Sequence, residues 1–217
     1  MPIEASLERE LPLVPDELTA FMDDYYERFI RVLSSLDRSP LSDMLRVLDE
    51  LMARESTLWL LGNGGSAGIS NHAACDLTKG PRGAGAPGLR CLSLASNVPM
   101  LSALGNDLGY ERIFAEQLAY YARPGDAVLL VSSSGNSPSI IEACTYANQS
   151  GLTTLAFVGF RGGRLKELAQ HCVWVPSDNY GIVEDTHQSL VHVLTQFLQQ
   201  RQRKPVSAAG PARKRKC

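Results

Sequence analysis

Two loops rich in serine and glycine are the parts of this sequence best suited to bind an anion. The first, residues 62–66, follows the apolar run 58–61, and the second, residues 132–137, follows the apolar run 127–131. Glycine lets the backbone approach an anion closely, and the hydroxyl and amide groups at the start of a following helix donate hydrogen bonds to it. Either loop alone could be an ordinary tight turn. Two such loops in one chain predict a site for a phosphorylated small molecule.

Neither loop is a nucleotide-binding motif. The first loop lacks the Lys-Ser/Thr ending of a Walker loop, and neither loop reads Gly-x-Gly-x-x-Gly. We therefore expect a phosphosugar or a similar phosphate monoester as the ligand, and no nucleotide cofactor.

A second set of residues could transfer protons. His72 and Asp76 are four residues apart and share one face of a predicted helix, while His192 lies on the last predicted helix, which begins with Glu184 and Asp185. Each residue alone could be a packed or solvated side chain, and acids are favourable at a helix N-terminus. Together, a carboxylate and an imidazole could remove the proton α to a carbonyl and move protons between oxygens. This is the chemistry of aldose–ketose isomerisation.

After residue 55, short apolar runs alternate with helical patterns. The predicted strands lie near 58–61, 90–94, 127–132, 153–158 and 172–175, and the predicted helices near 66–79, 97–104, 111–122, 137–150, 163–170 and 184–202. Short, wholly apolar strands are typical of a parallel sheet that is covered on both faces. The sequence therefore predicts a doubly wound α/β fold with a parallel sheet, in which both loops lie at the ligand-binding carboxyl edge.

The first 54 residues show a different pattern. Apolar residues recur at helical spacing from residue 15 to residue 54, with a break at Ser39-Pro40 and with Ser42 as the predicted cap of the second helix. We expect an N-terminal helical hairpin that packs against another subunit, because its apolar positions exceed what one face needs. The predicted division of the chain is an N-terminal helical extension at 1–54, the α/β domain at 55–203 and a disordered basic tail at 204–217.

Composition limits the classes of function. The chain is 44% hydrophobic, yet no apolar run reaches the roughly 20 residues that span a bilayer, and its first residues are charged where a signal peptide is apolar. Five cysteines without a Cys-x-x-Cys pair indicate free thiols, so we expect a cytoplasmic protein. Seven of the 21 basic residues lie in 201–217, which leaves an acidic body. Nucleic acid is therefore not the expected main partner.

Several segments resemble the sugar isomerase (SIS) domain of phosphoheptose isomerases. They occur in the same order and spacing between residues 18 and 199, namely at 61–67, 71–78, 104–114, 132–137 and 184–192. The resemblance implies a five-stranded parallel sheet with an N-terminal helical extension, a tetramer, and active sites between subunits. It also implies the conversion of sedoheptulose 7-phosphate into D-glycero-D-manno-heptose 7-phosphate.

The resemblance further implies roles for individual residues. Phosphate or sugar hydroxyls would be held by Ser66, Ser132, Ser134 and Ser137. The sugar chain would be contacted by Asn63 and Asp107. The acid and base would be Asp76 and His192. Some members bind zinc, and the corresponding ligands here would be His72, Asp76, Glu184 and His192, which are acceptable zinc ligands.

This sequence also departs from the family pattern. Asp76 stands where the family has a glutamate, which shifts the carboxylate by roughly 1 Å. Glu184 replaces a glutamine, and 180–183 replaces a segment with an Asp-Arg pair. The added carboxylate would either bind a cation more tightly or act as the base in place of Asp76. Two alternatives therefore stay open, a non-catalytic phosphosugar-binding regulatory protein and an isomerase of another sugar phosphate, such as an octose phosphate.

Overall fold

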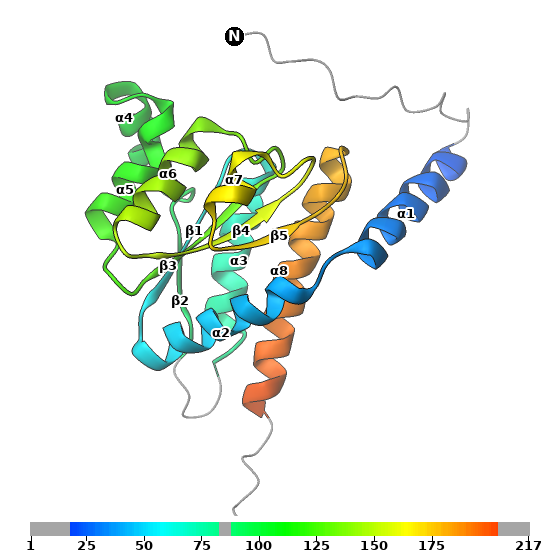
Figure 1. Cartoon of the computed structure of the whole chain (residues 1–217), viewed down its shortest axis with the longest axis horizontal. Helices are drawn as coiled ribbons and strands as arrows, with labels where there is room; N and C mark the ends of the chain where they lie inside the picture. The colour runs from blue at the N-terminus through cyan, green and yellow to red at the C-terminus, as the bar shows by residue number, and fades with distance from the viewer. Residues whose placement is uncertain (1–17, 83–87, 204–217) are drawn as a thin grey trace, which may run out of the picture.

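A five-stranded parallel sheet forms the centre of the structure (Figure 1). The computed structural model describes residues 18–82 and 88–203, so the predicted basic tail lies outside the described residues. The strand order is β2-β1-β3-β4-β5, and every neighbouring pair is parallel. The strands are β1 (Thr57–Gly62), β2 (Arg90–Ser93), β3 (Ala127–Ser132), β4 (Thr153–Val158) and β5 (His171–Trp174).

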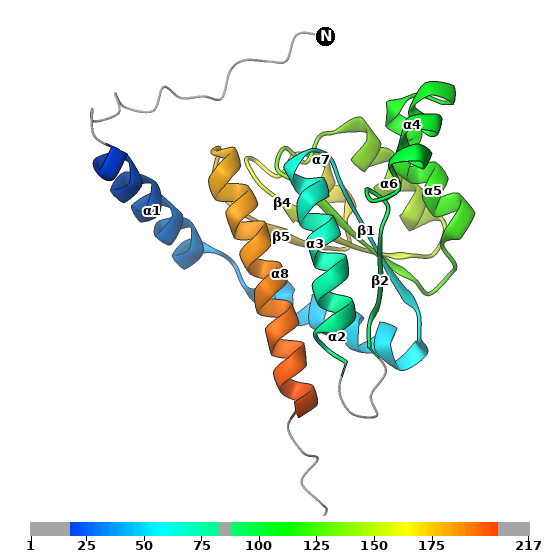
Figure 2. The same cartoon turned by 180° about the vertical axis from the view of Figure 1, so that it is seen from behind.

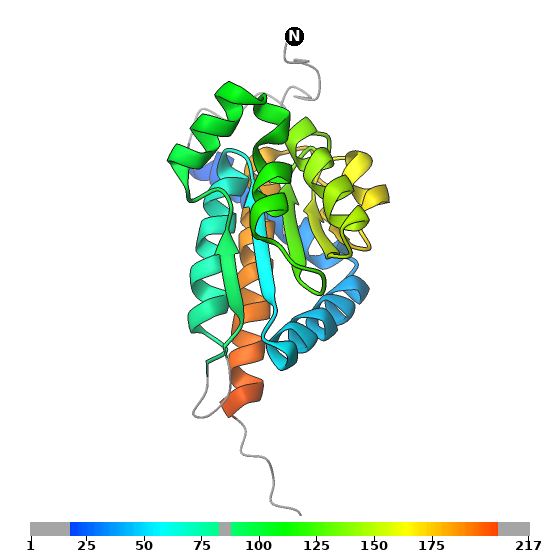
Figure 3. The same cartoon turned by 90° about the vertical axis from the view of Figure 1, so that its left-hand side faces the viewer.

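Helices cover both faces of this sheet, with α3 and α8 on one side and α5, α6 and α7 on the other (Figure 3). Their bounds are α1 (Leu18–Ser35), α2 (Ser39–Arg54), α3 (Gly65–Lys79), α4 (Val98–Asp107), α5 (Ile113–Tyr121), α6 (Pro138–Gln149), α7 (Gly163–Leu168) and α8 (Tyr180–Arg203), with a 3-10 turn η1 at Tyr110–Arg112. The predicted doubly wound α/β fold with a five-stranded parallel sheet is confirmed.

The strand sequences divide the core into two clusters. Side chains alternate across a strand, so Leu58 and Leu60 of β1 pack with α2, α3 and α8, while Trp59 and Leu61 pack with α4, α5 and α6. All residues of β1 and β3 are buried, whereas the edge strands β2 and β5 are partly exposed. Wholly apolar runs therefore mark the central strands, because only these are covered on both faces.

The two predicted N-terminal helices are present, but they do not fold back on each other as a hairpin. Helix α2 buries Met44, Leu48 and Leu51 against the sheet, whereas α1 buries no residue and extends away from the body (Figures 1 and 2). Helix α1 is tied instead to α8, where the Tyr25 hydroxyl donates to Asp185 Oδ2 at 2.6 Å. The domain boundary at residue 54 stays a prediction. Helix α2 lies before that boundary, yet its buried side chains pack in the same core cluster as the sheet.

Proline determines where α2 begins. Ser39 and Pro40 are its first residues, and Pro is tolerated there because the first helical amide groups lack partners within the helix. Ser42 therefore lies inside α2 and does not cap it, contrary to the prediction from sequence.

The four cysteines of the described residues are free thiols, as predicted. Burial raises the pKa of Cys91 to about 12 and that of Cys144 to about 11, so both thiols stay protonated and unreactive. Within residues 18–82 and 88–203, no helix is both long and apolar enough to cross a membrane.

Candidate active site

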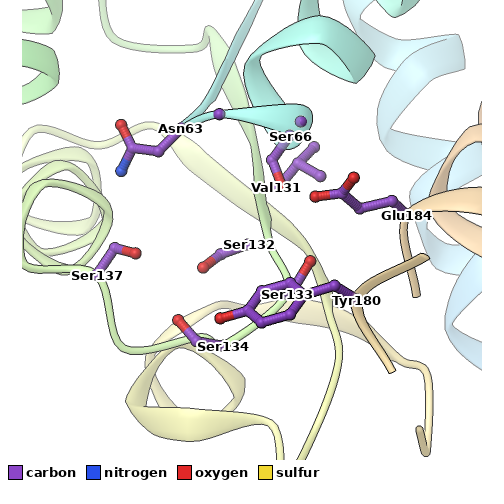
Figure 4. A pocket seen from close by; sticks show the side chains of 11 residues that line it. Asn63, Ser66, Val131, Ser132, Ser133, Ser134, Ser137, Tyr180 and Glu184 are labelled. Atoms are coloured by element: carbon purple, nitrogen blue, oxygen red, sulfur yellow. The ribbon is translucent and has the colours of Figure 1, made fainter. Parts of the chain in front are cut away.

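The two predicted anion-binding loops meet in one pocket at the carboxyl edge of the sheet (Figure 4). Strands β1 and β3 are neighbours, so the loops that follow them are adjacent. The pocket has a volume of about 250 Å³ and is lined by Asn63, Gly64, Gly65, Ser66, Val131, Ser132, Ser133, Ser134, Ser137, Tyr180 and Glu184. Five of the six predicted substrate-binding residues therefore share it, and the sixth, Asp107, is not among its lining residues.

Glycine shapes the first loop. Gly64 has a φ of +54°, a left-handed conformation that favours glycine, and α3 begins at the next residue. A Cβ on Gly62 would lie 2.6 Å from the carbonyl oxygen of Ser66. The first turn of α3 is thus drawn tightly against β1, and its residues Gly65 and Ser66 line the pocket.

The second loop is fixed by contacts with the start of α7. Gly135 has a φ of +63°, and a Cβ there would lie 2.0 Å from the carbonyl oxygen of Gly162. Asn136 Oδ1 accepts from the Arg164 amide at 2.9 Å, and Ser132 Oγ accepts from the Gly135 amide at 3.1 Å. These contacts tie the second loop to the start of α7 and restrict its backbone.

Ser137 stands at the N-cap of α6, yet its hydroxyl makes no capping hydrogen bond. Pro138, the first residue of α6, has no N–H, and the Ile140 amide donates to the Ser137 carbonyl oxygen. The Ser137 Oγ and the Ser139 amide are therefore available to an anion, which the positive end of the helix dipole favours.

Asn63 is oriented by two partners. Its Nδ2 donates to Ser139 Oγ at 2.9 Å, and its Oδ1 accepts from the Tyr110 hydroxyl at 3.0 Å. Asp107 comes from the same segment as Tyr110, but it is exposed and accepts a hydrogen bond from its neighbour Asn106. In that segment it is Tyr110, and not the predicted Asp107, that contacts a residue of the pocket.

Glu184 projects into the pocket from α8. A Cβ added to Gly65 would lie 2.2 Å from Glu184 Oε2, so the carboxylate stands over the first residue of α3. Partial burial, and secondly the neighbouring Asp185, raise the pKa of Glu184. In the described part of the chain no basic side chain forms an ion pair with it. The pocket thus combines serine hydroxyls with one unpaired carboxylate.

His72, Asp76 and His192 form a separate cluster between α3 and α8, which run side by side (Figure 2). His72 Nε2 lies 3.0 Å from Asp76 Oδ2 and 3.1 Å from His192 Nε2, and His192 Nε2 lies 3.9 Å from Asp76 Oδ2. Gln188 Nε2 contacts His192 Nε2 at 3.0 Å. Three donor atoms converge closely enough to hold one metal ion.

This cluster does not line the pocket. Glu184 and His192 are eight residues apart on α8, which separates them by about 12 Å along the helix axis. The structure therefore brings together three of the four predicted metal ligands and two of the three predicted catalytic residues, Asp76 and His192. It places the fourth predicted ligand, Glu184, with the serine loops.

Two further pocket residues were not predicted from sequence. Ser133 lies between two predicted serines, and its buried Oγ has no hydrogen-bond partner among the residues the structure describes. Tyr180 is 60% exposed and packs edge-on against Phe160, with ring centroids 4.6 Å apart. The feature of the sequence that could have pointed to Tyr180 is its position in 180–183, the segment that departs from the family pattern.

Comparison with known proteins agrees with this geometry. Residues 24–159 match the model of the SIS domain family. The phosphoheptose isomerase of Trichlorobacter lovleyi is 33% identical over 179 residues, covering 82% of this chain and 90% of that protein. That of Akkermansia muciniphila is 34% identical over 159 residues, covering 73% and 84%. A solved phosphoheptose isomerase from Neisseria gonorrhoeae has the same fold, with a TM-score of 0.78 at 23% identity over 85% of this chain and 100% of that one. The chain belongs to the SIS domain family and, within it, to the phosphoheptose isomerases.

Proposed function

We propose that this protein is a phosphosugar aldose–ketose isomerase that converts sedoheptulose 7-phosphate into D-glycero-D-manno-heptose 7-phosphate. The observation that carries the proposal is the serine-lined pocket at the carboxyl ends of β1 and β3, in a chain that belongs to the phosphoheptose isomerases. An intramolecular isomerisation of this kind needs an acid, a base and a phosphate site, and no redox cofactor.

The phosphate is assigned to the second loop. Ser132, Ser134 and Ser137 offer hydroxyls there, and the N-terminus of α6 offers the Ser139 amide, which has no partner among the described residues. The carboxylate of Glu184 disfavours a second anion beside α3, so the sugar hydroxyls are assigned to the first loop, near Asn63 and Ser66. This orientation places the phosphate away from the only unpaired carboxylate among the lining residues.

Proton transfer is assigned to Asp76 and His192. In this proposal Asp76 removes the proton α to the carbonyl and His192 moves protons between the two oxygens, while Glu184 is the alternative base. Asp76 and His192 lie within 3.9 Å of each other, which is close enough for both to act on one substrate.

The position of this pair supports an oligomeric enzyme. The acid–base pair lies outside the pocket of its own chain, and a second copy could bring its own pair to that pocket. Helix α1 carries exposed apolar side chains at four-residue intervals, Leu18, Met22, Tyr26 and Ile30. We propose a tetramer in which such surfaces are buried and each active site is completed by a neighbouring copy.

The cluster has the donor types and spacing that suit zinc. A tetrahedral zinc ion with bonds of about 2.0–2.1 Å has ligand atoms about 3.3 Å apart, and the three separations here are 3.0, 3.1 and 3.9 Å. His72, Asp76 and His192 would hold the ion as an alternative to the proton-transfer role of Asp76 and His192, and zinc would supply a Lewis acid that polarises a carbonyl oxygen. Removal by a chelator, followed by zinc titration of the wild type and of His72→Ala, tests this assignment. Equal zinc content in both proteins would contradict it.

The decisive experiment incubates the purified protein with sedoheptulose 7-phosphate and follows aldose formation by NMR. Parallel samples contain added zinc or a chelator. Turnover in any sample supports the isomerase, and loss of turnover with the chelator assigns a working role to the metal. Absence of turnover with every additive would contradict the function proposed here.

A phosphosugar-binding regulatory protein is the second candidate. It is favoured by the shorter carboxylate at Asp76 and by the distance between the acid–base pair and the pocket. A rise in melting temperature with sedoheptulose 7-phosphate, without turnover, would support it. Turnover of an octose phosphate but not of the heptose would instead assign the same chemistry to a longer sugar.

A further inference from the structure

We infer that Tyr110 is a positioning residue that holds the Asn63 amide in the orientation in which it meets the ligand. Its enzymatic test rests on the proposed function, and a spectroscopic test does not. Tyr110 is not a lining residue of the pocket and acts through Asn63, which is one.

The hydrogen bonds of Asn63 determine what it offers to a ligand. An asparagine amide has two N–H donors and one carbonyl acceptor. Ser139 Oγ takes one donor, at 2.9 Å, and the Tyr110 hydroxyl takes one of the two lone pairs of the carbonyl oxygen, at 3.0 Å. One N–H therefore remains for the ligand. Figure 4 shows the Asn63 amide on the same side of the pocket as Ser137.

The donor orientation depends on Tyr110 because the terminal torsion of asparagine is soft and roughly two-fold. Without the Tyr110 hydroxyl, the amide loses one of the two partners that hold this torsion and can rotate, up to a full reversal that presents its oxygen to the ligand in place of a nitrogen. A sugar carbonyl or phosphate oxygen needs a donor, so this reversal replaces an attractive contact by a repulsive one. Tyr110 thus restrains the Asn63 amide, which in this structure points its nitrogen at Ser139 and its oxygen at Tyr110.

The backbone places Tyr110 for this contact. Gly109 has a φ of +96°, which begins the short η1 turn, and η1 packs against both α4 and α6. The three residues come from the β1–α3 loop, η1 and α6, so one hydrogen-bond chain joins three segments at the edge of the pocket. Tyr110 is 61% exposed, so removal of its hydroxyl leaves the core intact.

The test compares Tyr110→Phe with Tyr120→Phe. Tyr120 is a matched control, because it is 56% exposed and lies on α5 outside the lining residues of the pocket. We expect Tyr110→Phe to reduce kcat/KM for sedoheptulose 7-phosphate about three- to tenfold, as the loss of one hydrogen bond does, with an unchanged melting temperature. Tyr120→Phe should behave as the wild type. Equal kinetics for the two variants would overturn the inference.

A double-mutant cycle with Asn63→Ala separates positioning from a general structural effect. If Tyr110 acts through Asn63, Tyr110→Phe has no further effect on kcat/KM when Asn63 is alanine. Full additivity of the two substitutions would overturn the inference.

NMR with ¹⁵N-labelled asparagine tests the same contact without any turnover. We expect Tyr110→Phe, and not Tyr120→Phe, to shift the Nδ2 amide resonances of Asn63 and to speed their hydrogen exchange. If the wild type turns over no sugar phosphate, the proposed function fails, and these resonances still decide the role of Tyr110. Unchanged Asn63 resonances would overturn it.

Discussion

The pocket and the His72–Asp76–His192 cluster differ in how strongly the fold fixes them. Ser66 and Ser132 of the pocket are at most 5% exposed, and a Cβ on Gly62, Gly65 or Gly135 would clash with neighbouring atoms. The side chains of His72 and His192 are 48% and 45% exposed, and their polar contacts are with one another, Asp76 and Gln188. Binding groups are thus preformed, whereas the groups assigned to proton transfer lie on an open surface that a metal ion or another subunit can complete.

The largest expected effect concerns the cluster. Asp76→Asn or His192→Ala should lower turnover of sedoheptulose 7-phosphate by about 10²–10⁴-fold, which is what general acid–base groups contribute. Binding of the sugar phosphate, measured by calorimetry, should persist because the pocket is intact. His171→Ala is the control, since His171 lies on β5 away from both regions. Near-normal turnover in both cluster variants would refute the assigned roles.

Helix α8 contains the same contrast between a buried and an exposed histidine. His187 is fully buried against Phe157, and burial lowers its pKa to about 4. The unfolded chain binds the proton near its ordinary pKa of 6.5, so this contribution to the free energy of unfolding is constant above about pH 6.5 and declines toward pH 4. The total loss is about 3 kcal/mol.

Urea unfolding at about pH 7.5 and about pH 4.5 measures this loss, and His187→Leu should show a smaller decrease than the wild type. In the wild type the His187 ring resonances should not titrate above about pH 5. Equal pH dependence for both proteins would show that His187 is not the group responsible.

The rigidity of the second loop can be tested by adding one methyl group. Gly135→Ala should destabilise the protein by about 2–3 kcal/mol, from the positive φ and the clash with Gly162, and should weaken sugar-phosphate binding about tenfold. Gly151→Ala has a similar φ of +74° but nothing within 4 Å of the new Cβ, so it should cost about 1 kcal/mol and leave binding unchanged. Chemical denaturation and calorimetry give the two quantities. Comparable binding losses in both variants would argue against a preformed loop.

The smallest expected effect is a change in sugar-phosphate affinity. It tests whether Glu184 acts in the pocket or in the His72–Asp76–His192 cluster. Glu184→Gln removes the unpaired carboxylate from the pocket, so the phosphorylated sugar should bind about three- to tenfold more tightly. Zinc binding to the cluster should not change, because Glu184 and His192 are separated by two turns of α8. Loss of zinc in this variant would instead place Glu184 among the metal ligands. Calorimetry with the sugar phosphate and with zinc provides both measurements.

Local patterns predicted most of the elements, because wholly apolar runs occur only where a strand is buried on both faces. No end of a predicted strand differs from the observed end by more than one residue, and the bounds of β3 and β4 are the same. Helix α8 begins at Tyr180 and not at 184, since Asn179 Oδ1 accepts from the Ile182 amide at 3.0 Å and caps it. That cap could have been recognised, as asparagine is a preferred N-cap residue.

The site was harder to predict where it depends on distance through space. Asp107 was chosen from its segment, yet the neighbouring Tyr110 is the residue that contacts the pocket through Asn63. Glu184 was grouped with His192 as a metal ligand. The two residues are eight positions apart on one helix, and the rise of an α-helix separates them by about 12 Å, so this part of the prediction could have been avoided from the sequence.

The sequence by itself determined the parallel sheet and the meeting of the two serine loops, because strand periodicity is local and parallel strands end at one edge. Only the tertiary structure decided that α3 lies beside α8, which brings His72 within 3.1 Å of His192, 120 residues later in the chain. It also decided that Glu184 stands over the start of α3. The packing of one helix on another depends on core contacts between distant residues, which no local pattern in the chain specifies.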